Sequence, residues 1–522
     1  MPHINGDCLE IILNELRFDS STLHSCILVN RLWCRITIPI LWKKFFYFYY
    51  CNKTEPNLRN KFYDIIIYLL PKSSKQLLFD KNILKSPYNH HNNDDSLPPL
   101  FNYINYFTQI SPNFIDNVIQ KLINKDFKSI KFQGQVQEKD NYEKDTNYYY
   151  YNFNNNNNNN NDNNNYNNNF ILEQEIYKLF INNCNNIKFF QWETIQPLTR
   201  FLGISKCFSQ LRFLSIDLEL VNSLSLFEMS QICQNIEYLG LRNCNQDIPG
   251  LINFIDIQKN LQSLNFYLYN TGSIKNQCIQ LSEVIERKAI TLKKFTIVSD
   301  ITLLSPKILP SLINLESLEI DGRVMNKENI ELHIKEWRKY LSLANFPNLQ
   351  YLKTDWPFFK EHLLIEKSNG NILEIRIYYN NDPIYTNQLI NSISRFCPRI
   401  ERLTICVEIE NFDGIKEIFL NCNQLKKIYL LTKNEGKFNC DDLLKILLDY
   451  SSKNFYEFCF DDNWIFTVEA LENFFENWRC RNPLIFKKYG YKRLYFKDDH
   501  EFIVRKYYNE GVIKETNCLI YL

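Results

Sequence analysis

The sequence predicts an α/β fold in which parallel strands are backed by helices, preceded by a small all-α unit. The first observation is an apolar pattern that recurs along much of the 522-residue chain at intervals of 23 to 34 residues. The second is that apolar residues between the copies have helical spacing. The third is a run of three short amphipathic segments within residues 1–45.

The recurring unit reads apolar-x-x-apolar-x-apolar, as in "LRFLSI" and "IERLTI". One copy of such a short pattern would carry no information, but eleven copies at a similar spacing indicate a repeat array. The copies begin at Ile187, Leu211, Ile236, Leu261, Leu292, Leu315, Leu349, Ile372, Ile400, Leu425 and Phe455.

Each unit predicts one strand and one helix. The end of the pattern alternates with period two, which is typical of a short strand with one buried face. Segments such as "SLFEMSQICQN" and "NQLINSISRFC" precede strands and have the apolar spacing of a helix. A single strand and helix cannot bury their own apolar faces, whereas stacked copies can. The longer intervals after Leu261, Leu315 and Leu425 are expected to contain loop insertions.

These repeats resemble leucine-rich repeats, in particular the cysteine-containing subclass, over roughly residues 180–480. Cys184, Cys233, Cys397 and Cys422 each stand three residues before a repeat's first apolar position, and Cys244 follows a strand pattern. The resemblance implies a horseshoe of parallel strands backed by helices. We interpret the cysteines as small packing residues at the helix-to-strand turn, because no pair has zinc-like spacing.

The first 45 residues predict three short helices. Asp7 is expected to cap the first helix and Ser20 or Ser21 the second. The third is expected to run from about Asn30 to Trp42, with Pro39 shifting or interrupting it. So many large apolar side chains cannot all point into one tiny core. The surplus is expected to pack against the following connector or against a partner.

This segment resembles the F-box between residues 4 and 42. Ile4 and Asn5 occupy the Leu-Pro positions of the family pattern. The further matches are Leu9, Ile12, Leu16, Val29, Arg31, Trp33, Leu41 and Trp42. An F-box followed by leucine-rich repeats is similar to the large fungal class of F-box/leucine-rich-repeat proteins.

The resemblance implies a substrate-recognition adaptor of an SCF-type cullin–RING E3 ubiquitin ligase. In that family the F-box binds the Skp-type subunit, and through it the cullin–RING ligase, while the repeats hold a target protein. The alternative is a leucine-rich-repeat interaction scaffold that acts outside ubiquitination. The residues expected to contact the adaptor are Ile4, Leu9, Ile12, Leu16, Leu23, Val29 and Trp33. For Leu9, Leu16 and Val29, packing between the helices is an equally good interpretation.

A target is expected to dock on the concave face, which the strand residues between the buried ones would form. The candidates are Arg242, Tyr267, Glu319, Asp321, Lys353, Asp355, Arg376, Tyr378, Arg402 and Lys427. Their signs alternate, which suits a mixed protein surface better than the continuous positive charge that phosphate tracking needs. The alternative is a solvated sheet face without a partner.

The predicted domain plan has five parts. Residues 1–45 form the F-box, 46–135 a helical connector with room for irregular first repeats, as at "FKSIKFQG", and 136–170 a disordered Tyr/Asn-rich insertion. The repeat array occupies 171–480 and a C-terminal cap 481–522. The insertion is expected to be disordered because it contains too few aliphatic residues to offset the entropy of ordering.

Composition favours an adaptor over an enzyme or a nucleic-acid binder. The formal net charge is +1, so no global field attracts nucleic acid or an acidic membrane. The sequence lacks G-x-S-x-G, H-E-x-x-H and Walker motifs, so we expect no enzyme, cofactor or metal. No secretory signal or membrane-spanning run is visible, which predicts a cytoplasmic and/or nuclear protein.

Overall fold

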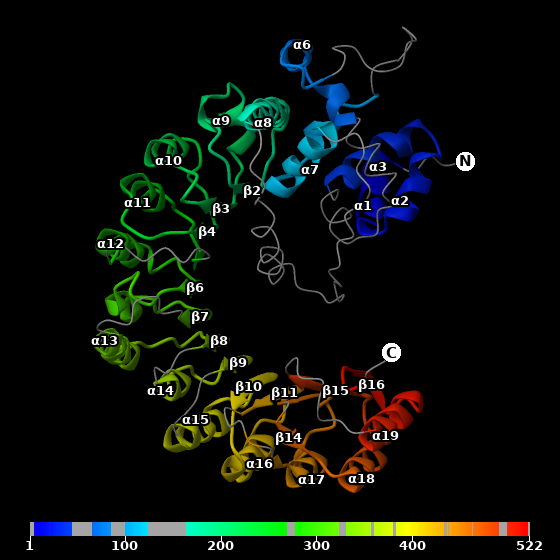
Figure 1. Cartoon of the computed structure of the whole chain (residues 1–522), viewed down its shortest axis with the longest axis vertical. Helices are drawn as coiled ribbons and strands as arrows, with labels where there is room; N and C mark the ends of the chain where they lie inside the picture. Colours follow the sequence, from blue (N-terminus) through cyan, green and yellow to red (C-terminus); the bar gives the residue numbers. More distant parts are fainter. Residues whose placement is uncertain are drawn as a thin grey trace. The chain divides into compact units, whose positions relative to one another are not determined.

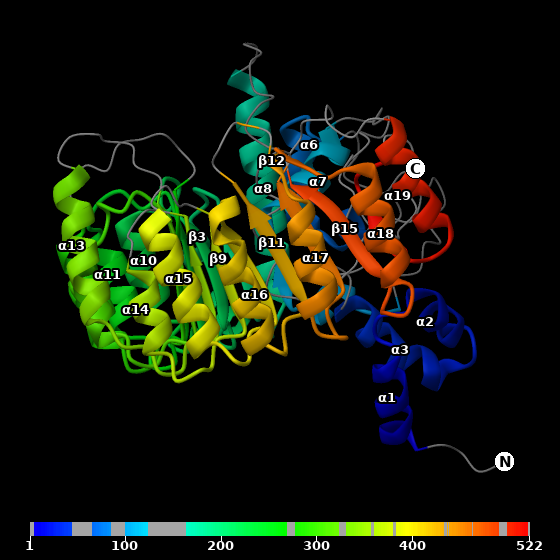
Figure 2. The same ribbon diagram turned by 90° about the horizontal axis from the view of Figure 1, so that it is seen from below.

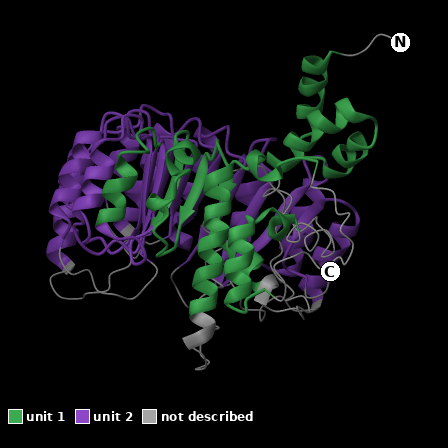
Figure 3. Cartoon of the chain, turned by 90° about the horizontal axis from the view of Figure 1, so that it is seen from above, with its two compact units in different colours: residues 1–216, 224–236 green, residues 217–223, 237–522 purple. Residues whose placement is uncertain are grey.

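The computed structural model describes residues 5–43, 65–84, 100–123, 163–268, 277–322, 330–355, 360–378, 383–432, 436, 438–461, 463–489 and 498–519. The chain divides into two compact units, which Figure 3 colours separately. The first unit contains residues 1–216 and 224–236. The second contains residues 217–223 and 237–522. Each unit is described by itself below.

The first unit begins with three helices, α1 (Gly6–Glu15), α2 (Ser20–Ile27) and α3 (Arg31–Lys43). Their shared core consists of Leu9, Leu13, Leu23, Cys26 and Ile40, which are all buried. Leu16, Trp33, Ile36 and Leu41 pack against this core and are partly buried. The three predicted helices are therefore present, with a core of their own.

The helix caps differ from those predicted. Asn5 rather than Asp7 caps α1, and its side chain accepts a hydrogen bond from the Asp7 backbone N–H at 3.4 Å. Asp19 rather than a serine caps α2, accepting from the Thr22 N–H at 3.0 Å. Asp19 stands directly before the helix, whereas Ser20 and Ser21 lie within it, so the Asp19 carboxylate is the side chain that can accept from the free N–H groups of the first turn. Helix α3 also continues through Pro39, because buried Ile38, Ile40 and Trp42 hold both sides of that turn.

The rest of the first unit connects these helices to the start of the array. Trp42 packs on Tyr103 and Phe107, with ring centroids 4.7 and 5.7 Å away. The surplus apolar surface of α3 is thus partly covered by the connector, as one of the two expectations stated. The elements are α6 (Lys72–Asp80), η1 (Tyr103–Tyr106), β1 (Gln109–Ile110), α7 (Pro112–Ile123), α8 (Asn163–Asn183), β2 (Phe189–Trp192), η2 (Leu198–Arg200), α9 (Ile204–Phe208), β3 (Phe213–Asp217) and α10 (Ser223–Ser230).

The second unit is a continuous series of parallel strands with helices between them. Its strands are β4 (Tyr238–Arg242), β5 (Ser263–Tyr267), β6 (Lys294–Ser299), β7 (Ser317–Gly322), β8 (Tyr351–Thr354), β9 (Glu374–Ile377), β10 (Arg402–Cys406), β11 (Lys427–Leu431), β13 (Glu457–Asp461), β15 (Leu484–Tyr489) and β16 (Ile513–Thr516), paired in this order. A separate small sheet pairs β12 (Phe438–Asn439) with β14 (Trp464–Ile465).

Helices cover one face of this sheet. They are α11 (Pro249–Asp256), α12 (Ile279–Lys288), η3 (Pro306–Ser311), α13 (Ile330–Leu343), α14 (Glu361–Glu366), α15 (Pro383–Phe396), η4 (Ile409–Asn411), α16 (Phe412–Asn421), α17 (Asp441–Tyr450), α18 (Val468–Trp478) and α19 (Asp498–Asn509). Figure 1 shows the strands of this unit on the inner side of its curve and the helices on the outer side. Figure 2 shows α14 to α18 side by side along the helical layer.

The predicted repeats are found in register with the strands. Each strand from β2 to β11, and β13, begins two residues after the first apolar residue of its repeat. All eleven of those first residues, from Ile187 to Phe455, are at most 1% exposed. They fill the core between strands and helices, while the period-two alternation determines which side chains face away from the helices. The α/β prediction with parallel strands backed by helices is therefore confirmed.

The structure differs from the plan, or adds to it, at three points. Strand β1 pairs in parallel with β2, so the first extra repeat strand lies at 109–110, whereas "FKSIKFQG" lies outside the described residues. Helix α8 begins at Asn163 inside the predicted disordered insertion, because the apolar residues from Phe170 onward extend its helix. Residues 124–162 lie outside the described residues. The C-terminal segment continues the array, since β15 and β16 extend the parallel pairing beyond residue 480.

The repeat cysteines lie in the core at the helix-to-strand turns. Cys184, Cys233, Cys397 and Cys422 are at most 2% exposed. Burial raises the pKa of Cys233 and of Cys422 to about 12, because a thiolate would lose its hydration there. Protonated, enclosed thiols behave as small packing groups. Among the described residues, no group of three or more potential metal ligands comes together.

Basic side chains of one repeat donate hydrogen bonds to the C-terminal end of the helix in the preceding repeat. Arg481 donates to the Leu448 carbonyl in the last turn of α17 at 2.5 Å, and to the hydroxyl of the C-cap residue Ser451 at 2.7 Å. Lys288 donates to the Gln258 carbonyl after α11, and Lys367 donates to the Ala344 carbonyl after α13. Such contacts satisfy the last carbonyls of each helix and favour a cation there.

Replacing Arg481 with alanine is expected to lower the free energy of unfolding by about 1.5 kcal/mol, because partly buried carbonyls lose charged donors. The matched control is Lys445→Ala, which removes an exposed lysine from α17, the helix that Arg481 caps. This change should leave the free energy of unfolding unchanged. Urea unfolding followed by circular dichroism compares the two variants. Equal stability of both variants would contradict the capping role of Arg481.

Candidate protein-interaction surfaces

Apolar side chains are exposed on the three-helix unit although its core is already filled. Leu28 is 85% exposed and Val29 57%, at the turn between α2 and α3. Ile11 and Ile12 on α1 are 67% and 50% exposed, and Leu32 on α3 is 46% exposed. Large apolar residues that stay exposed beside a filled core are candidates for contact with another protein. We call Ile11, Ile12, Leu28, Val29 and Leu32 the apolar surface of the three-helix unit.

The predicted adaptor-contact residues fall into three groups in the structure. Ile12 and Val29 lie on the apolar surface, and Leu16 and Trp33 pack against the core while remaining partly exposed. Leu9 and Leu23 are 1% and 0% exposed, so their side chains are occupied by packing between the helices. Ile4 lies outside the described residues.

Ile11, Leu28 and Leu32 were not among the predicted contacts. The predicted helical spacing could have identified Ile11 and Leu32, since each falls off the core face of its helix. Leu28 stands directly after the last residue of α2, where helical periodicity no longer assigns a face.

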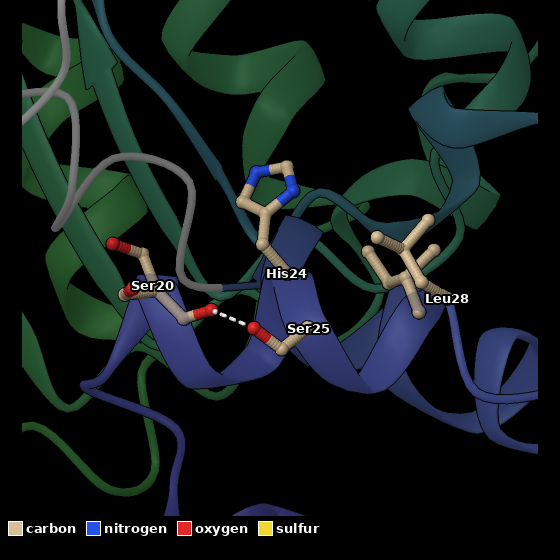
Figure 4. A pocket seen from close by; sticks show the side chains of 6 residues that line it. Ser20, His24, Ser25 and Leu28 are labelled. Atoms are coloured by element: carbon tan, nitrogen blue, oxygen red, sulfur yellow. Dashed lines mark hydrogen bonds between the residues drawn. The ribbon is translucent and has the colours of Figure 1, made fainter.

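A shallow depression borders this surface on α2. It has a volume of about 410 Å³ and is lined by Ser20, Ser21, His24, Ser25, Ile27 and Leu28. Figure 4 shows His24 and Leu28 along one side of the helix, and the Ser25 hydroxyl donating to the Ser21 carbonyl. The lining contains one titratable side chain and no acid–base pair. The lining otherwise combines serine hydroxyls with the apolar side chains of Ile27 and Leu28.

Most of the predicted concave-face residues lie on strands of the second unit, while Asp355 and Tyr378 directly follow a strand. Glu319, Lys353 and Arg376 are direct cross-strand neighbours on β7, β8 and β9. Arg402 and Lys427 are neighbours on β10 and β11. Asp321 lies at the end of β7, while Tyr267, Asp355 and Tyr378 lie at or after their strand ends and are half-buried.

Arg242 differs from this group. Its residue is only 4% exposed, so we expect it to contribute packing rather than target contact. The neighbouring Asn243 has a positive φ of 57° and donates to the Asp217 carboxylate at 3.0 Å. This end of the strand is therefore occupied by internal hydrogen bonds.

The alternating charges on the face form ion pairs with one another. Lys353 Nζ lies 2.6 Å from Glu319 Oε1 and 3.8 Å from Asp321 Oδ2. Arg376 and Arg402 both lie 2.5 Å from the Glu374 carboxylate, and Lys427 lies 2.7 Å from Glu457. Glu374 and Glu457 were missed by the sequence interpretation, although both stand at the first strand position after the repeat's apolar pattern begins.

Partial burial changes the acidity of these groups. Burial lowers the pKa of Lys353, but the charges of Glu319 and Asp321 and the hydrogen bond from Lys353 to Glu319 outweigh it, so the pKa is raised overall. For Arg376 burial acts in the same direction, and Glu374 more than offsets it. Burial also raises the pKa of Tyr429, whose hydroxyl donates to Glu457. Lys353 and Arg376 therefore stay charged at physiological pH.

Comparisons with known proteins supply no argument about this chain. No protein-family model and no curated protein matches this chain. A solved structure described as the crystal structure of the Rad7 and Elc1 complex in yeast is similar at a TM-score of 0.38 and 16% identity, over 60% of this chain and 78% of that chain. Such a distant likeness carries no argument about function.

No helix in the described part of the chain has the length and apolar character that crossing a bilayer requires.

The architecture itself is clear from the strands. Three features define a leucine-rich-repeat array. The strands pair in parallel in chain order, and most of them are separated by one helix or helical turn. A buried apolar residue stands two positions before each repeat strand. The chain is an α/β protein of the leucine-rich-repeat fold class.

Proposed function

We propose that the chain is the substrate-recognition adaptor of an SCF-type cullin–RING ubiquitin ligase. The N-terminal helices bind a Skp-type subunit as an F-box, and the repeats bind a target protein. The observation that carries the proposal is the exposed apolar surface on a three-helix unit that already has a complete core. Leu28 and Val29 are its most prominent part, and Val29 begins the F-box-like series Val29-x-Arg31-x-Trp33.

In this mechanism the chain itself performs no chemical step. It raises the local concentration of target lysines near the ubiquitin thioester, which its partners carry. An adaptor needs one apolar docking surface and one separate target surface. The exposed residues of α1 to α3 supply the first, and the strand face of the second unit supplies the second. The proposed site of action is the cytoplasm and/or nucleus.

Affinity purification of the full chain from its own cells, read by mass spectrometry, tests the proposal. A Skp-type adaptor together with a cullin is the expected result. Recovery of the adaptor without a cullin would favour the alternative, an interaction scaffold that acts outside ubiquitination. Recovery of neither from a folded, soluble chain would overturn the proposal.

A further inference from the structure

The strand face of the second unit brings like charges together at its centre. Lys353 on β8 is the direct neighbour of Arg376 on β9, and Arg402 on β10 is the direct neighbour of Lys427 on β11. Like charges directly opposite each other on a sheet destabilise it. Two such pairs on four consecutive strands repel internally, so nearby carboxylates are needed to offset the repulsion.

The compensating carboxylates lie beneath the cations. The side chains of Arg376 and Arg402 are 30% and 39% exposed, whereas the Glu374 side chain between them is 3% exposed. Lys427 is 20% exposed and its partner Glu457 is 6% exposed. A ligand approaching β9 to β11 would thus meet the cations first. Around Lys353 the exposures of cation and acids are similar, at 20% for Lys353, 16% for Glu319 and 21% for Asp321.

The single negative charge of Glu374 neutralises only one of the two positive charges of Arg376 and Arg402. Both guanidinium groups share the two oxygens of one carboxylate, so this triad keeps a net charge of +1. The buried Nε of Arg402 has no hydrogen-bond partner among the described residues. One further carboxylate would neutralise the triad, whereas a phosphate dianion would make it negative.

We infer that the face formed by Arg376, Arg402 and Lys427 binds an acidic peptide segment of the target protein, with an Asp or Glu carboxylate on the two arginines. The inference rests on the proposed function, because it specifies the target-binding half of the adaptor. Carboxylates suit this site because guanidinium groups donate parallel hydrogen bonds to them. The Tyr351 ring also contacts the site, with its centroid 6.0 Å from the Arg376 guanidinium carbon.

Fluorescence anisotropy with a labelled twelve-residue Glu/Asp-rich peptide tests the inference. The variant is Arg402→Gln, which leaves Glu374 paired with Arg376 and so avoids a buried unpaired charge. The control is Lys445→Gln on α17, which changes the net charge by the same amount at an exposed site away from the strands. A labelled oligothymidylate of equal charge serves as a second probe.

The expected result is salt-sensitive peptide binding that falls roughly tenfold in Arg402→Gln and stays unchanged in Lys445→Gln. An equal fall in both variants would show that net charge alone attracts the peptide, and would overturn the inference. Absence of peptide binding by the folded full chain would overturn it too. Stronger, Arg402-dependent binding of the oligothymidylate would assign the face to nucleic acid instead. None of these outcomes alters adaptor capture by α1 to α3, which is measured separately.

Discussion

Replacing Leu28 and Val29 together with aspartate is expected to abolish capture of the Skp-type adaptor while the chain stays folded. The two side chains are 85% and 57% exposed, so charged replacements cost little in the free protein. In a complex the carboxylates would be buried against apolar groups without partners, which costs several kcal/mol. We expect affinity to fall by at least about a hundredfold. Co-purification of the variant with recombinant adaptor measures the effect.

The matched control for this double variant is Leu23→Asp. Leu23 is 0% exposed in the core of the same three helices, so the substitution places a charge inside that core. Capture should then be lost together with the helical circular dichroism of this segment. Retained capture by Leu28→Asp/Val29→Asp would show that the apolar surface binds something other than the adaptor.

Gly250→Ala is expected to cause the largest loss of stability of any conservative change in the array. A Cβ atom at Gly250 would lie 2.0 Å from the Ser223 carbonyl oxygen, which is a backbone atom and cannot turn aside. The Gly250 N–H also donates to the Ser223 hydroxyl at 2.8 Å. Both residues belong to the second unit, so the clash forces α11 away from its packed position. A loss of about 3 kcal/mol in the free energy of unfolding is expected.

The urea midpoint of the variant, followed by far-ultraviolet circular dichroism, measures this loss. Gly6→Ala is the control, because a Cβ there meets nothing closer than 3.8 Å and lies at the start of α1. Alanine also favours helices over glycine, so the control should be unchanged or slightly more stable. An unchanged midpoint for Gly250→Ala would mean that α11 can pack further from Ser223 without cost.

The array was predictable because its information is periodic. Each copy from Ile187 to Phe455 has too few residues to be recognised alone, but the shared spacing determines both the strand positions and the buried face. The three N-terminal helices were predictable for the same reason, from the positions of Leu9, Leu13, Leu23 and Ile40.

The features that the sequence did not predict depend on local details of single residues or on contacts between segments that are far apart in the chain. Whether Asn5 or Asp7 caps α1 depends on the residue at which the helix begins, and the helix begins at Gly6, directly after Asn5. Strand β1 is only two residues long and becomes recognisable through its pairing with β2. Helix α8 extends into the Asn-rich tract from an apolar segment that begins at Phe170.

The candidate sites were predicted less well than the fold. Helical periodicity cannot decide which apolar residues of a three-helix unit fill the core and which face a partner, so Leu9 and Leu23 were grouped with Val29. On the strand face, alternation assigned Lys353, Arg376, Arg402 and Lys427 to strand positions that they also have in the structure, whereas Arg242 is buried. Alternation missed Glu374 and Glu457, because their burial beneath the cations depends on pairs between adjacent strands.

Direct binding between the purified full chain and a purified Skp-type adaptor tests the central claim most directly. Isothermal titration calorimetry, with size-exclusion chromatography and light scattering on the same samples, gives the affinity and the stoichiometry. The account predicts a one-to-one complex with a Kd below about 1 μM, which the Leu28→Asp/Val29→Asp variant does not form. Separate elution and no measurable heat, from a chain whose circular dichroism shows folded helices and strands, would contradict it.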